Sequence, residues 1–231
     1  MGTLQERSLI SVVIPTLNAA GTMSGTLATL RNSALLREVV ITDGGSSDET
    51  VAYAASAGAR VIAAPRGRGG QLAAGAGAAS GDWLLFLHAD CRLELGWESP
   101  VDAFVKAPGA EDRAGYFDLA LDDPAPAARR LERIVAWRCR VLALPYGDQG
   151  LLIARRLYDA VGGFAPLPLM EDVDLARRLG PQRLARIGAR CLASARRYRQ
   201  DGYLWRPLRN LLCLALYFAG VPPARILRLY G

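Results

Sequence analysis

Residues 83–90 read Trp-Leu-Leu-Phe-Leu-His-Ala-Asp, and this stretch decides the fold. A continuous apolar run that ends in polar residues is typical of a strand buried on both faces of a parallel sheet. Shorter apolar runs at residues 9–15, 39–42 and 61–64 precede it, and a helical pattern follows each of them. Four such repeats predict an α/β fold with a mostly parallel central sheet and helices on both faces.

After Asp90 the alternation becomes irregular. Residues 116–121 alternate like a strand, residues 131–142 carry a helical stripe, and residues 149–153 form a short strand before another helix. Helical patterns return at residues 171–179 and 204–219. No linker separates the halves, so we expect one domain over residues 1–203. Its first half, about 9–90, is regular, its second half, about 91–203, is mixed, and an amphipathic helical appendage follows at 204–231.

Composition excludes several classes of protein. The chain has 231 residues, of which 51% are hydrophobic and 22% charged, and this excludes disordered, collagen-like and disulfide-knot proteins. Its formal charge is +6 and Lys106 is its single lysine, so the positive charge is almost wholly arginine. Guanidinium groups suit phosphates, although an excess of this size also fits a solvated surface. Aromatic and basic residues interleave too sparsely to predict a nucleic-acid partner.

The expected setting is cytoplasmic. Four cysteines without a CxxC pair argue against a zinc site or a disulfide framework. Residues 1–8 are polar and lack the apolar core of a signal peptide. The apolar stretch at residues 211–221 is too short to span a bilayer.

Polar residues follow each of the four early strands, at 15–18, 43–48, 66–70 and 88–90, and ligands of open parallel sheets bind at these strand ends. Each segment also has a plain structural interpretation as a turn or a cap. Asn18 is a candidate cap of the first helix, and Ser46 with Glu49 has capping-box spacing. Residues 66–70 combine arginines and glycines before a helix, without either common phosphate-loop motif.

The second half carries further candidates. Three carboxylates at residues 171–174 either complement a helix dipole or include a general base in a sheltered pocket. Residues 147–150 are either a turn or part of a site. Residues 196–199, Arg-Arg-Tyr-Arg, are either a phosphate clamp or a solvated edge.

Several of these motifs occur together in one order along the chain. Residues 12–18 read VVIPTLN, residues 41–48 ITDGGSSD, residues 85–90 LFLHAD, and Glu171-Asp172 follows. Together they resemble the family 2 glycosyltransferases of the GT-A fold over about residues 9–180. GDQG at residues 147–150, GGF at 162–164 and PLMED at 168–172 look like the short bacterial subgroup associated with radical-SAM and selenodomain proteins.

This resemblance implies the reaction and its residues. It implies an inverting transfer of a sugar from a nucleotide-diphosphate donor to an acceptor hydroxyl, with Asp172 as general base and Glu171 beside it. The implied donor-binding residues are Pro15, Thr16, Asn18, Asp43, Gly44, Arg68, Gln71, His88, Ala89 and Asp90. The implied acceptor-side residues are Gly147, Asp148 and Gln149.

One residue departs from the family pattern. His88 replaces the first acid of the DxD motif, which leaves Asp90 as the carboxylate that matches the metal ligand. Either Asp90 alone or Asp90 with His88 holds the implied divalent cation, Mn²⁺ or Mg²⁺, and an imidazole ligand favours Mn²⁺.

Two other functions stay open: a sugar-phosphate nucleotidyltransferase, and a protein that binds nucleotide sugars without catalysis. The acceptor is hinted at only by residues 204–230, where aromatic and leucine residues interleave with arginines. Such a segment either lies on an anionic membrane surface or packs on the catalytic domain. The first interpretation predicts a lipid-linked or apolar acceptor, met at the inner face of the membrane.

Overall fold

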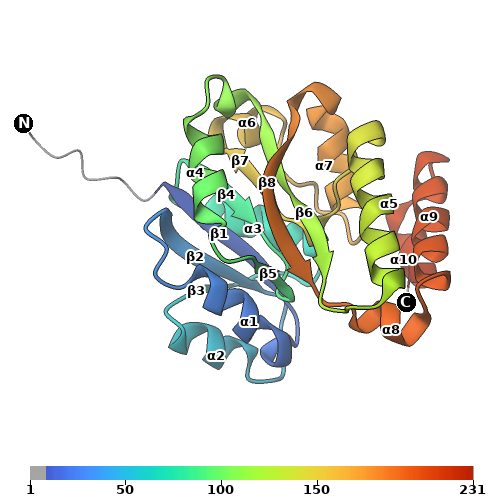
Figure 1. The fold of residues 1–231 in the computed structure, drawn as a ribbon. Coiled ribbons are helices and arrows are strands. Elements are labelled where there is room, and N and C mark those ends of the chain that lie inside the picture. Colours follow the sequence, from blue (N-terminus) through green and yellow to red (C-terminus); the bar gives the residue numbers. More distant parts are fainter. Residues whose placement is uncertain (1–8, 231) are drawn as a thin grey trace, which may run out of the picture.

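A mixed eight-stranded sheet forms the centre of residues 9–230, the part of the chain that the computed structural model describes (Figure 1). The strand order is β3-β2-β1-β4-β7-β6-β8-β5. Residues 1–8, on which the expectation about a signal peptide rests, lie outside the described part. The four early strands are parallel, as the sequence predicts: β1 (Ile10–Thr16), β2 (Leu36–Asp43), β3 (Arg60–Ala63) and β4 (Trp83–Phe86).

The other half of the sheet is mixed, which was also expected. Strand β7 is antiparallel to both β4 and β6, while β8 is parallel to β6 and antiparallel to β5. The bounds of these strands are β5 (Cys91–Leu93), β6 (Ala114–Leu121), β7 (Leu151–Ala154) and β8 (Leu184–Ala193). The observed architecture is the α/β fold with a mixed second half that the sequence predicts.

Helices cover both faces of the sheet because neighbouring residues of a strand point to opposite faces. Val12 and Ile14 belong to a core shared with α1, α4 and α5, whereas Val13 belongs to a second core with α3, α6 and α7. The helices are α1 (Ala20–Leu30), α2 (Thr50–Ser56), α3 (Arg68–Ala78), α4 (Glu98–Lys106), α5 (Pro126–Leu142), α6 (Arg155–Ala160), α7 (Glu171–Leu179), α8 (Arg196–Asp201), α9 (Trp205–Phe218) and α10 (Pro223–Tyr230). Three-residue 3₁₀ turns lie at η1 (Ala110–Asp112), η2 (Gly147–Gln149) and η3 (Pro181–Arg183).

Helix α3 lies close to the sheet at Gly75. A Cβ atom at Gly75 would collide with the side chains of Val13 and Thr42. The glycine therefore lets the helix approach β1 and β2, and this brings its first turn to the ends of those strands.

The predicted helix caps at Asn18 and Ser46 were wrong. Neither of these side chains caps a helix, and α2 begins only at Thr50. The Asp48 carboxylate accepts hydrogen bonds from the first amides of both helices, those of Ala20 (3.2 Å) and Thr50 (3.0 Å). Instead, the backbone amide of Asn18 donates to Ser46 Oγ (2.8 Å), and the Asn18 side-chain oxygen accepts from the amide of Ser47 (2.9 Å). These polar side chains join the loops after β1 and β2, a contact between distant segments that local spacing does not reveal.

The C-terminal segment consists of two helices, α9 and α10. Cys213, Leu214 and Ile226 are buried in a third core together with Leu169 and Met170. The inner face of the segment thus packs on the domain, as the second interpretation proposed. Of the helices within residues 9–230, none is long and apolar enough to cross a membrane.

Candidate active site

Two adjoining cavities lie at the carboxyl ends of β1 and β4. The first, here called the strand-end cavity, has a volume of about 790 Å³. Eight of the ten predicted donor-binding residues line it: Pro15, Thr16, Asn18, Arg68, Gln71, His88, Ala89 and Asp90. Two parallel strands and the first turn of α3 therefore bring together residues that are up to 75 positions apart in the sequence.

The second, here called the central cavity, has a volume of about 170 Å³. Three carboxylates, Asp90, Asp148 and Asp172, line it together with Gly147. Arginines also line it, and the two cavities share a set of lining residues: Arg68, His88, Asp90, Ser194, Arg197 and Tyr230. The predicted metal and base residues and two of the three predicted acceptor-side residues thus meet next to the predicted donor-binding residues.

Asp43 and Gly44 lie beneath the strand-end cavity rather than in its wall. The Asp43 carboxylate accepts hydrogen bonds from Thr16 Oγ1 (3.0 Å), from the amide of Gly45 (2.9 Å) and from the amide and hydroxyl of Ser46 (2.7 and 2.5 Å). Burial alone would raise the pKa of Asp43, but these hydrogen bonds hold it below the usual value. Asp43 therefore orders the loop after β2, and in this arrangement its oxygens do not face a ligand.

Gln71 has a similar positioning role. Its side chain is buried, and its amide nitrogen donates to the carbonyls of Thr16 (2.8 Å) and Thr42 (2.7 Å). The residue joins the first turns of α3 to the ends of β1 and β2.

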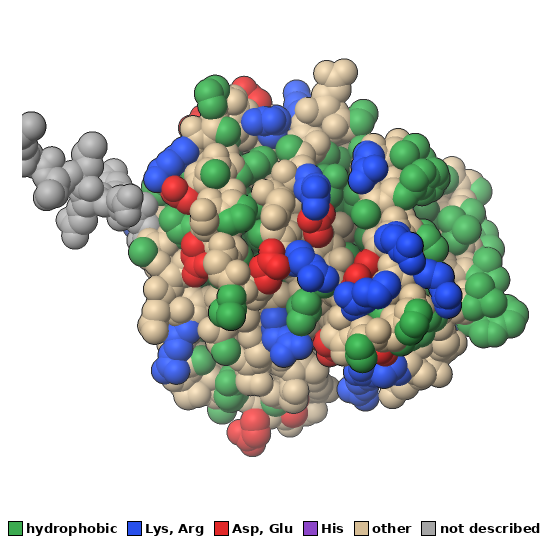
Figure 2. Space-filling model, in the orientation of Figure 1, with side chains coloured by type: hydrophobic (Ala, Val, Ile, Leu, Met, Phe, Trp, Pro, Cys, Tyr) green, Lys and Arg blue, Asp and Glu red, His purple; other side chains and the backbone are tan. Residues whose placement is uncertain are grey.

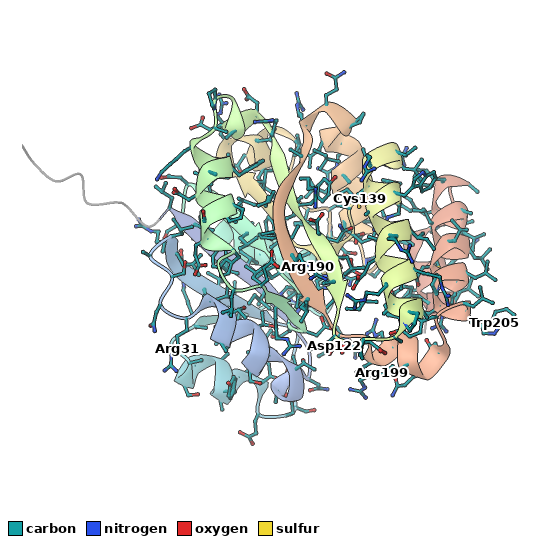
Figure 3. The ribbon with its side chains drawn as sticks, in the orientation of Figure 1. Arg31, Asp122, Cys139, Arg190, Arg199 and Trp205 are labelled. Atoms are coloured by element: carbon teal, nitrogen blue, oxygen red, sulfur yellow. The ribbon has the colours of Figure 1, made fainter. Side chains whose placement is uncertain are left out.

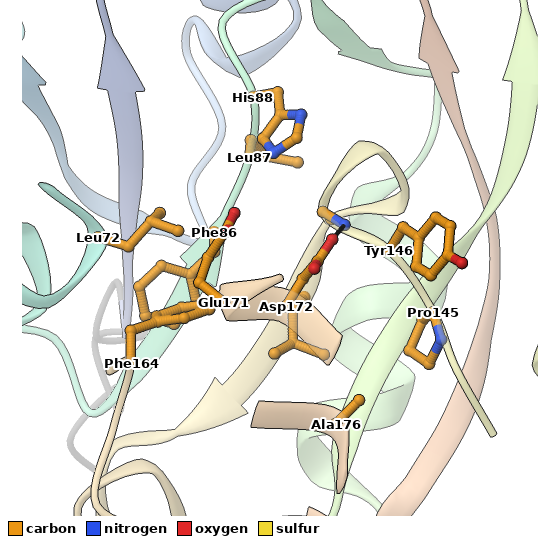
Figure 4. A pocket seen from close by; sticks show the side chains of 13 residues that line it. Leu72, Phe86, Leu87, His88, Pro145, Tyr146, Phe164, Glu171, Asp172 and Ala176 are labelled. Atoms are coloured by element: carbon orange, nitrogen blue, oxygen red, sulfur yellow. Dashed lines mark hydrogen bonds between the residues drawn. The ribbon is translucent and has the colours of Figure 1, made fainter. Parts of the chain in front are cut away.

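Glu171 and Asp172 begin α7, directly after Met170, whose φ of 65° lies in the left-handed region. A non-glycine residue pays a conformational cost there, and such strain occurs often at functional sites. Asp172 Oδ2 accepts a hydrogen bond from the amide of Gly147 (2.8 Å), drawn as a dashed line in Figure 4. The contact holds this carboxylate against η2 at the wall of the central cavity.

The Glu171 carboxylate is buried and forms an ion pair with the guanidinium of Arg68. Burial raises the pKa of Glu171 to about 7, against the opposing effect of Arg68, and the neighbouring charge of Asp172 adds to the rise. Figure 4 shows Glu171 among the apolar side chains of Leu72, Phe86 and Phe164. Asp172, in contrast, lines the central cavity, where a substrate has access.

His88 is a neutral imidazole in this site. Burial lowers the pKa of its ring to about 3, and the positive charges of Arg68 and Arg197 lower it further. A neutral imidazole keeps a lone pair for a metal ion. The ring also packs tightly against η2, because a Cβ atom at Gly147 would lie 2.5 Å from His88 Nε2.

The residues at the end of β4 fit a divalent cation. His88, Asp90 and Cys91 each offer one ligand atom, and these atoms lie within 4.8 Å of one another. The Cys91 thiol is buried and its Sγ contacts the carbonyl of Asp148 (3.4 Å). A hydrogen bond with Cys191 and burial raise its pKa well above the usual value, so it stays protonated and binds a metal poorly. Asp90 and His88 are the two ligands this set offers.

Asp148 lines the central cavity with one carboxylate oxygen, Oδ1, that is buried and has no hydrogen-bond partner among the described residues. Burial raises its pKa to about 6, and the charges of Asp172 and Asp90 contribute, against the opposing effect of Arg138. A buried polar atom without a partner is costly, so its retention points to a ligand.

The prediction that Gln149 faces the acceptor was wrong. Its side chain is buried and donates to the carbonyl of Phe117 (3.0 Å), while its oxygen accepts from Arg138 Nη2 (3.0 Å). Its oxygen also accepts from the amide of Tyr146 (3.3 Å), so both ends of the side-chain amide bind the protein itself and order η2.

Sequence reasoning missed several residues of the site. Tyr230, at the end of α10, lines both cavities, and the Arg206 guanidinium lies 4.6 Å from the centroid of its ring. Tyr146 and Asn210 also line the central cavity, together with Tyr198 from the predicted 196–199 stretch. Asn210 and Tyr230 carry no local motif, because their place depends on how α9 and α10 fold back. The one available signal was the interleaving of aromatic residues and arginines over residues 204–230.

The four residues at 196–199 divide between the two interpretations. Arg197 lines both cavities and thus faces the site. Arg199 instead forms ion pairs with Asp122 (3.7 Å) and Asp123 (3.8 Å) at the surface, and Figure 3 shows Arg199 beside Asp122.

The fold is that of known glycosyltransferases. The chain is similar to the crystal structure of glucosyl-3-phosphoglycerate synthase from Mycobacterium tuberculosis in complex with Mn²⁺, UDP and phosphoglyceric acid. The identity is 24%, the TM-score is 0.63, and the match covers 93% of this chain and 79% of the other. It is also similar to Staphylococcus aureus TarS in complex with UDP-GlcNAc, with 15% identity, a TM-score of 0.63, and coverage of 96% and 70%.

A curated relative is the PGL/p-HBAD biosynthesis glycosyltransferase of Mycobacterium tuberculosis. It is 37% identical over 93 residues, which are 37% of this chain and 36% of the relative. The match thus spans about a third of the length of that relative.

A family model described as glycosyl transferase family 2 matches residues 11–166, more than half of the chain. That range includes the strand-end loops, His88, Asp90 and η2. The chain therefore belongs to glycosyltransferase family 2 and has the GT-A fold.

Proposed function

We propose that this enzyme transfers a sugar from a nucleotide-diphosphate donor to an acceptor hydroxyl with inversion at the anomeric carbon. One observation carries the proposal: Asp90, in the turn after β4, and Asp172, in the first turn of α7, meet at the central cavity next to the strand-end cavity. UDP is the first nucleotide to test, since the similar mycobacterial and staphylococcal structures hold UDP or a UDP-sugar.

The donor occupies the strand-end cavity in this proposal. Pro15, Thr16 and Asn18 form the wall against the nucleoside, and Asp43 keeps their loop in place from below. Arg68 and Arg197 bind the diphosphate by charge-assisted hydrogen bonds, and the N-terminus of α3 adds its dipole. Asp90 and His88 hold the divalent cation, which neutralises the charge of the departing nucleoside diphosphate when it is bound.

Asp172 acts as the general base. It accepts the proton of the acceptor hydroxyl while the oxygen attacks the anomeric carbon and the bond to the diphosphate breaks. Because attack and departure occur on opposite faces of one carbon, a single displacement inverts it. The hydrogen bond from Gly147 fixes the orientation of Asp172, whereas Glu171 is bound to Arg68 and positions the donor side.

Thermal unfolding with and without UDP and Mn²⁺ tests the donor site. A ligand that binds only the folded state raises the midpoint; at 100 times its dissociation constant it adds about 2.7 kcal/mol. For a chain of this size that corresponds to roughly 5–10 °C. We expect a metal-dependent rise that Asp90→Ala abolishes and that the surface variant Asp112→Ala keeps.

Two results would contradict the proposal. Absence of any shift with UDP, GDP, CDP or dTDP, with either Mn²⁺ or Mg²⁺, excludes the donor site. A full shift without turnover of any UDP-sugar favours the alternative of a protein that binds nucleotide sugars without catalysis.

We also propose that the enzyme contacts the inner face of the membrane, where it meets a lipid-linked or apolar acceptor. Trp205 and Leu212 of α9 are 69% and 54% exposed, and Figure 3 shows Trp205 pointing away from the domain. Sedimentation with phosphatidylglycerol vesicles tests this contact. The double variant Trp205→Ser/Leu212→Ser should stay in the supernatant, and equal sedimentation of variant and wild type would exclude these residues from the contact.

A further inference from the structure

An apolar groove of about 700 Å³ lies between α5 and α9, which run side by side at the edge of the domain (Figure 1). Its lining includes Leu131, Ile134, Trp137, Leu208, Leu211 and Leu214. Figure 2 shows hydrophobic side chains gathered over α9, with basic side chains over α5 beside them. Ile134, Trp137 and Leu211 are 61%, 56% and 60% exposed, which is costly for an unoccupied surface.

The groove joins the central cavity. Four residues line both spaces, namely Tyr146, Asp148, Tyr198 and Asn210, and we call this set the throat. The throat is polar while the groove is apolar, so the polarity changes at the point where the groove meets the predicted catalytic centre. Asp172 lies on the far side of the throat, in the central cavity.

Two side-chain oxygens of the throat lack hydrogen-bond partners. Asn210 Oδ1 and Asp148 Oδ1 are both buried, and neither accepts a hydrogen bond from the described residues. Buried polar atoms in proteins are nearly always satisfied, so these two acceptors are available to a bound group that carries hydroxyl donors.

The groove itself offers little to a charged ligand. Outside the throat, two charged residues line the groove, Arg130 and Arg138. Arg138 donates hydrogen bonds to the carbonyl of Leu144 (2.9 Å) and to the side-chain oxygen of Gln149 (3.0 Å). Its guanidinium also lies 3.5 Å from the centroid of the Tyr146 ring. Its donors thus serve the protein, and the other charged residue, Arg130, is exposed. The remaining wall of the groove is mainly apolar and suits a hydrocarbon chain.

We propose that the groove binds the hydrocarbon chain of an amphiphilic acceptor, whose hydroxyl-bearing head passes through the throat to Asp172. The inference rests on the proposed function, since it names the class of acceptor for that site. The head donates hydroxyl hydrogen bonds to Asn210 and Asp148, and the chain lies against Ile134, Trp137 and Leu211. The same hydroxyl transfer then applies: the oxygen bonds to the anomeric carbon, the diphosphate leaves, and Asp172 takes the proton.

Binding of a series of alkyl β-glucosides tests the groove without any need for turnover. Methyl, butyl, hexyl and octyl glucosides are compared by the rise in unfolding midpoint, each below the concentration at which it forms micelles. The burial of one methylene group strengthens binding by up to about fourfold. We expect affinity to rise about two- to fourfold per methylene from butyl to octyl.

Leu211→Ser and Leu212→Ser form a matched pair for this test. Both residues are exposed on α9, but Leu211 lines the groove and Leu212 does not. We expect Leu211→Ser to weaken octyl glucoside binding at least fivefold and to leave methyl glucoside unchanged, with Leu212→Ser like the wild type. Asn210→Leu should weaken every member of the series equally, because it removes a contact to the head.

Other outcomes overturn the inference. Affinity independent of chain length excludes a chain in the groove. Equal losses in Leu211→Ser and Leu212→Ser indicate general adsorption to an apolar surface or membrane. A dimer that Leu211→Ser dissociates shows that a second copy of the chain fills the groove. The response to UDP with Mn²⁺ separates the two failures, because it remains when only the acceptor inference is wrong and is absent when the proposed function is wrong.

Discussion

Arg68 and Glu171 form an ion pair that joins the first turn of α3 to the first turn of α7. The Glu171 side chain is 1% exposed and that of Arg68 is 28% exposed, so the carboxylate depends on this one cation. The pair connects the strand-end cavity with the segment that carries Asp172. It thereby links the predicted donor side to the predicted base.

Replacing Arg68 with Met should destabilise the protein in a pH-dependent way. Removing one partner of a buried pair leaves an uncompensated charge, and we expect a loss of up to about 3 kcal/mol in the free energy of unfolding at pH 8.5. At pH 5.5 the loss should be smaller, because Glu171 then binds a proton. In the wild type the pKa of Glu171 is raised to about 7, although Arg68 lowers it, and the variant lacks that lowering effect. A raised pKa in the folded state makes stability fall as pH rises, so the additional loss of the variant develops as pH rises above about 7.

Denaturant unfolding at the two pH values measures this effect. Glu171→Gln in the Arg68→Met background is the control, since it removes the titrating group and should make the loss equal at both pH values. If Arg68→Met lost the same free energy of unfolding at both pH values, Glu171 would not be the group that titrates.

Asp172→Asn should reduce turnover by about 10²- to 10⁴-fold, the usual contribution of a general base. The variant keeps an oxygen for the Gly147 amide, so the fold and the UDP-dependent rise in midpoint should persist. Release of UDP from the bound donor measures turnover. Asp174→Asn is the matched control, because Asp174 lies in the same turn of α7 but pairs with Arg178 (2.6 Å). Full activity in Asp172→Asn would show that Asp172 is not the general base.

Gly147→Ala should impair metal-dependent UDP binding more than it impairs folding. The new Cβ would press on the His88 ring at 2.5 Å, and φ at Gly147 is not among the positive values, so the backbone tolerates alanine. Gly77→Ala in α3 is the control, because its Cβ meets no atom within 4 Å and alanine favours a helix by up to about 1 kcal/mol. The measurement is the midpoint rise with UDP and Mn²⁺, and an unchanged rise in Gly147→Ala would show that His88 need not keep its place.

Asp148→Asn should stabilise the protein above pH 6. The pKa of Asp148 is raised from 3.8 to about 6, so the wild type loses stability as pH rises through that window, by at most about 1.4 kcal/mol per pH unit. Asparagine does not titrate and avoids the loss. Unfolding free energies at pH 4 and pH 7.5 give the test, with Asp112→Asn as the exposed control. No gain at pH 7.5 would mean that Asp148 is solvated in solution.

The sequence by itself determined the parallel half of the sheet. Strands β1 to β4 are short apolar runs, and their polar ends at Pro15, Arg68 and Asp90 had to meet because parallel strands end on one side. Local periodicity carries that information. The alternating strand β8, which lies between β6 and β5, was missed, because its pairing partners are distant in the chain.

Only the tertiary structure decided which side chains face the cavities. Gln149 and Asp43 have residue types suited to a site, but their polar groups are satisfied by Phe117, Thr16 and Ser46. Tyr230 joins the site only because α10 folds back over α7. A sequence states which donors and acceptors a chain possesses, whereas contacts between distant segments determine which of them remain available to a substrate.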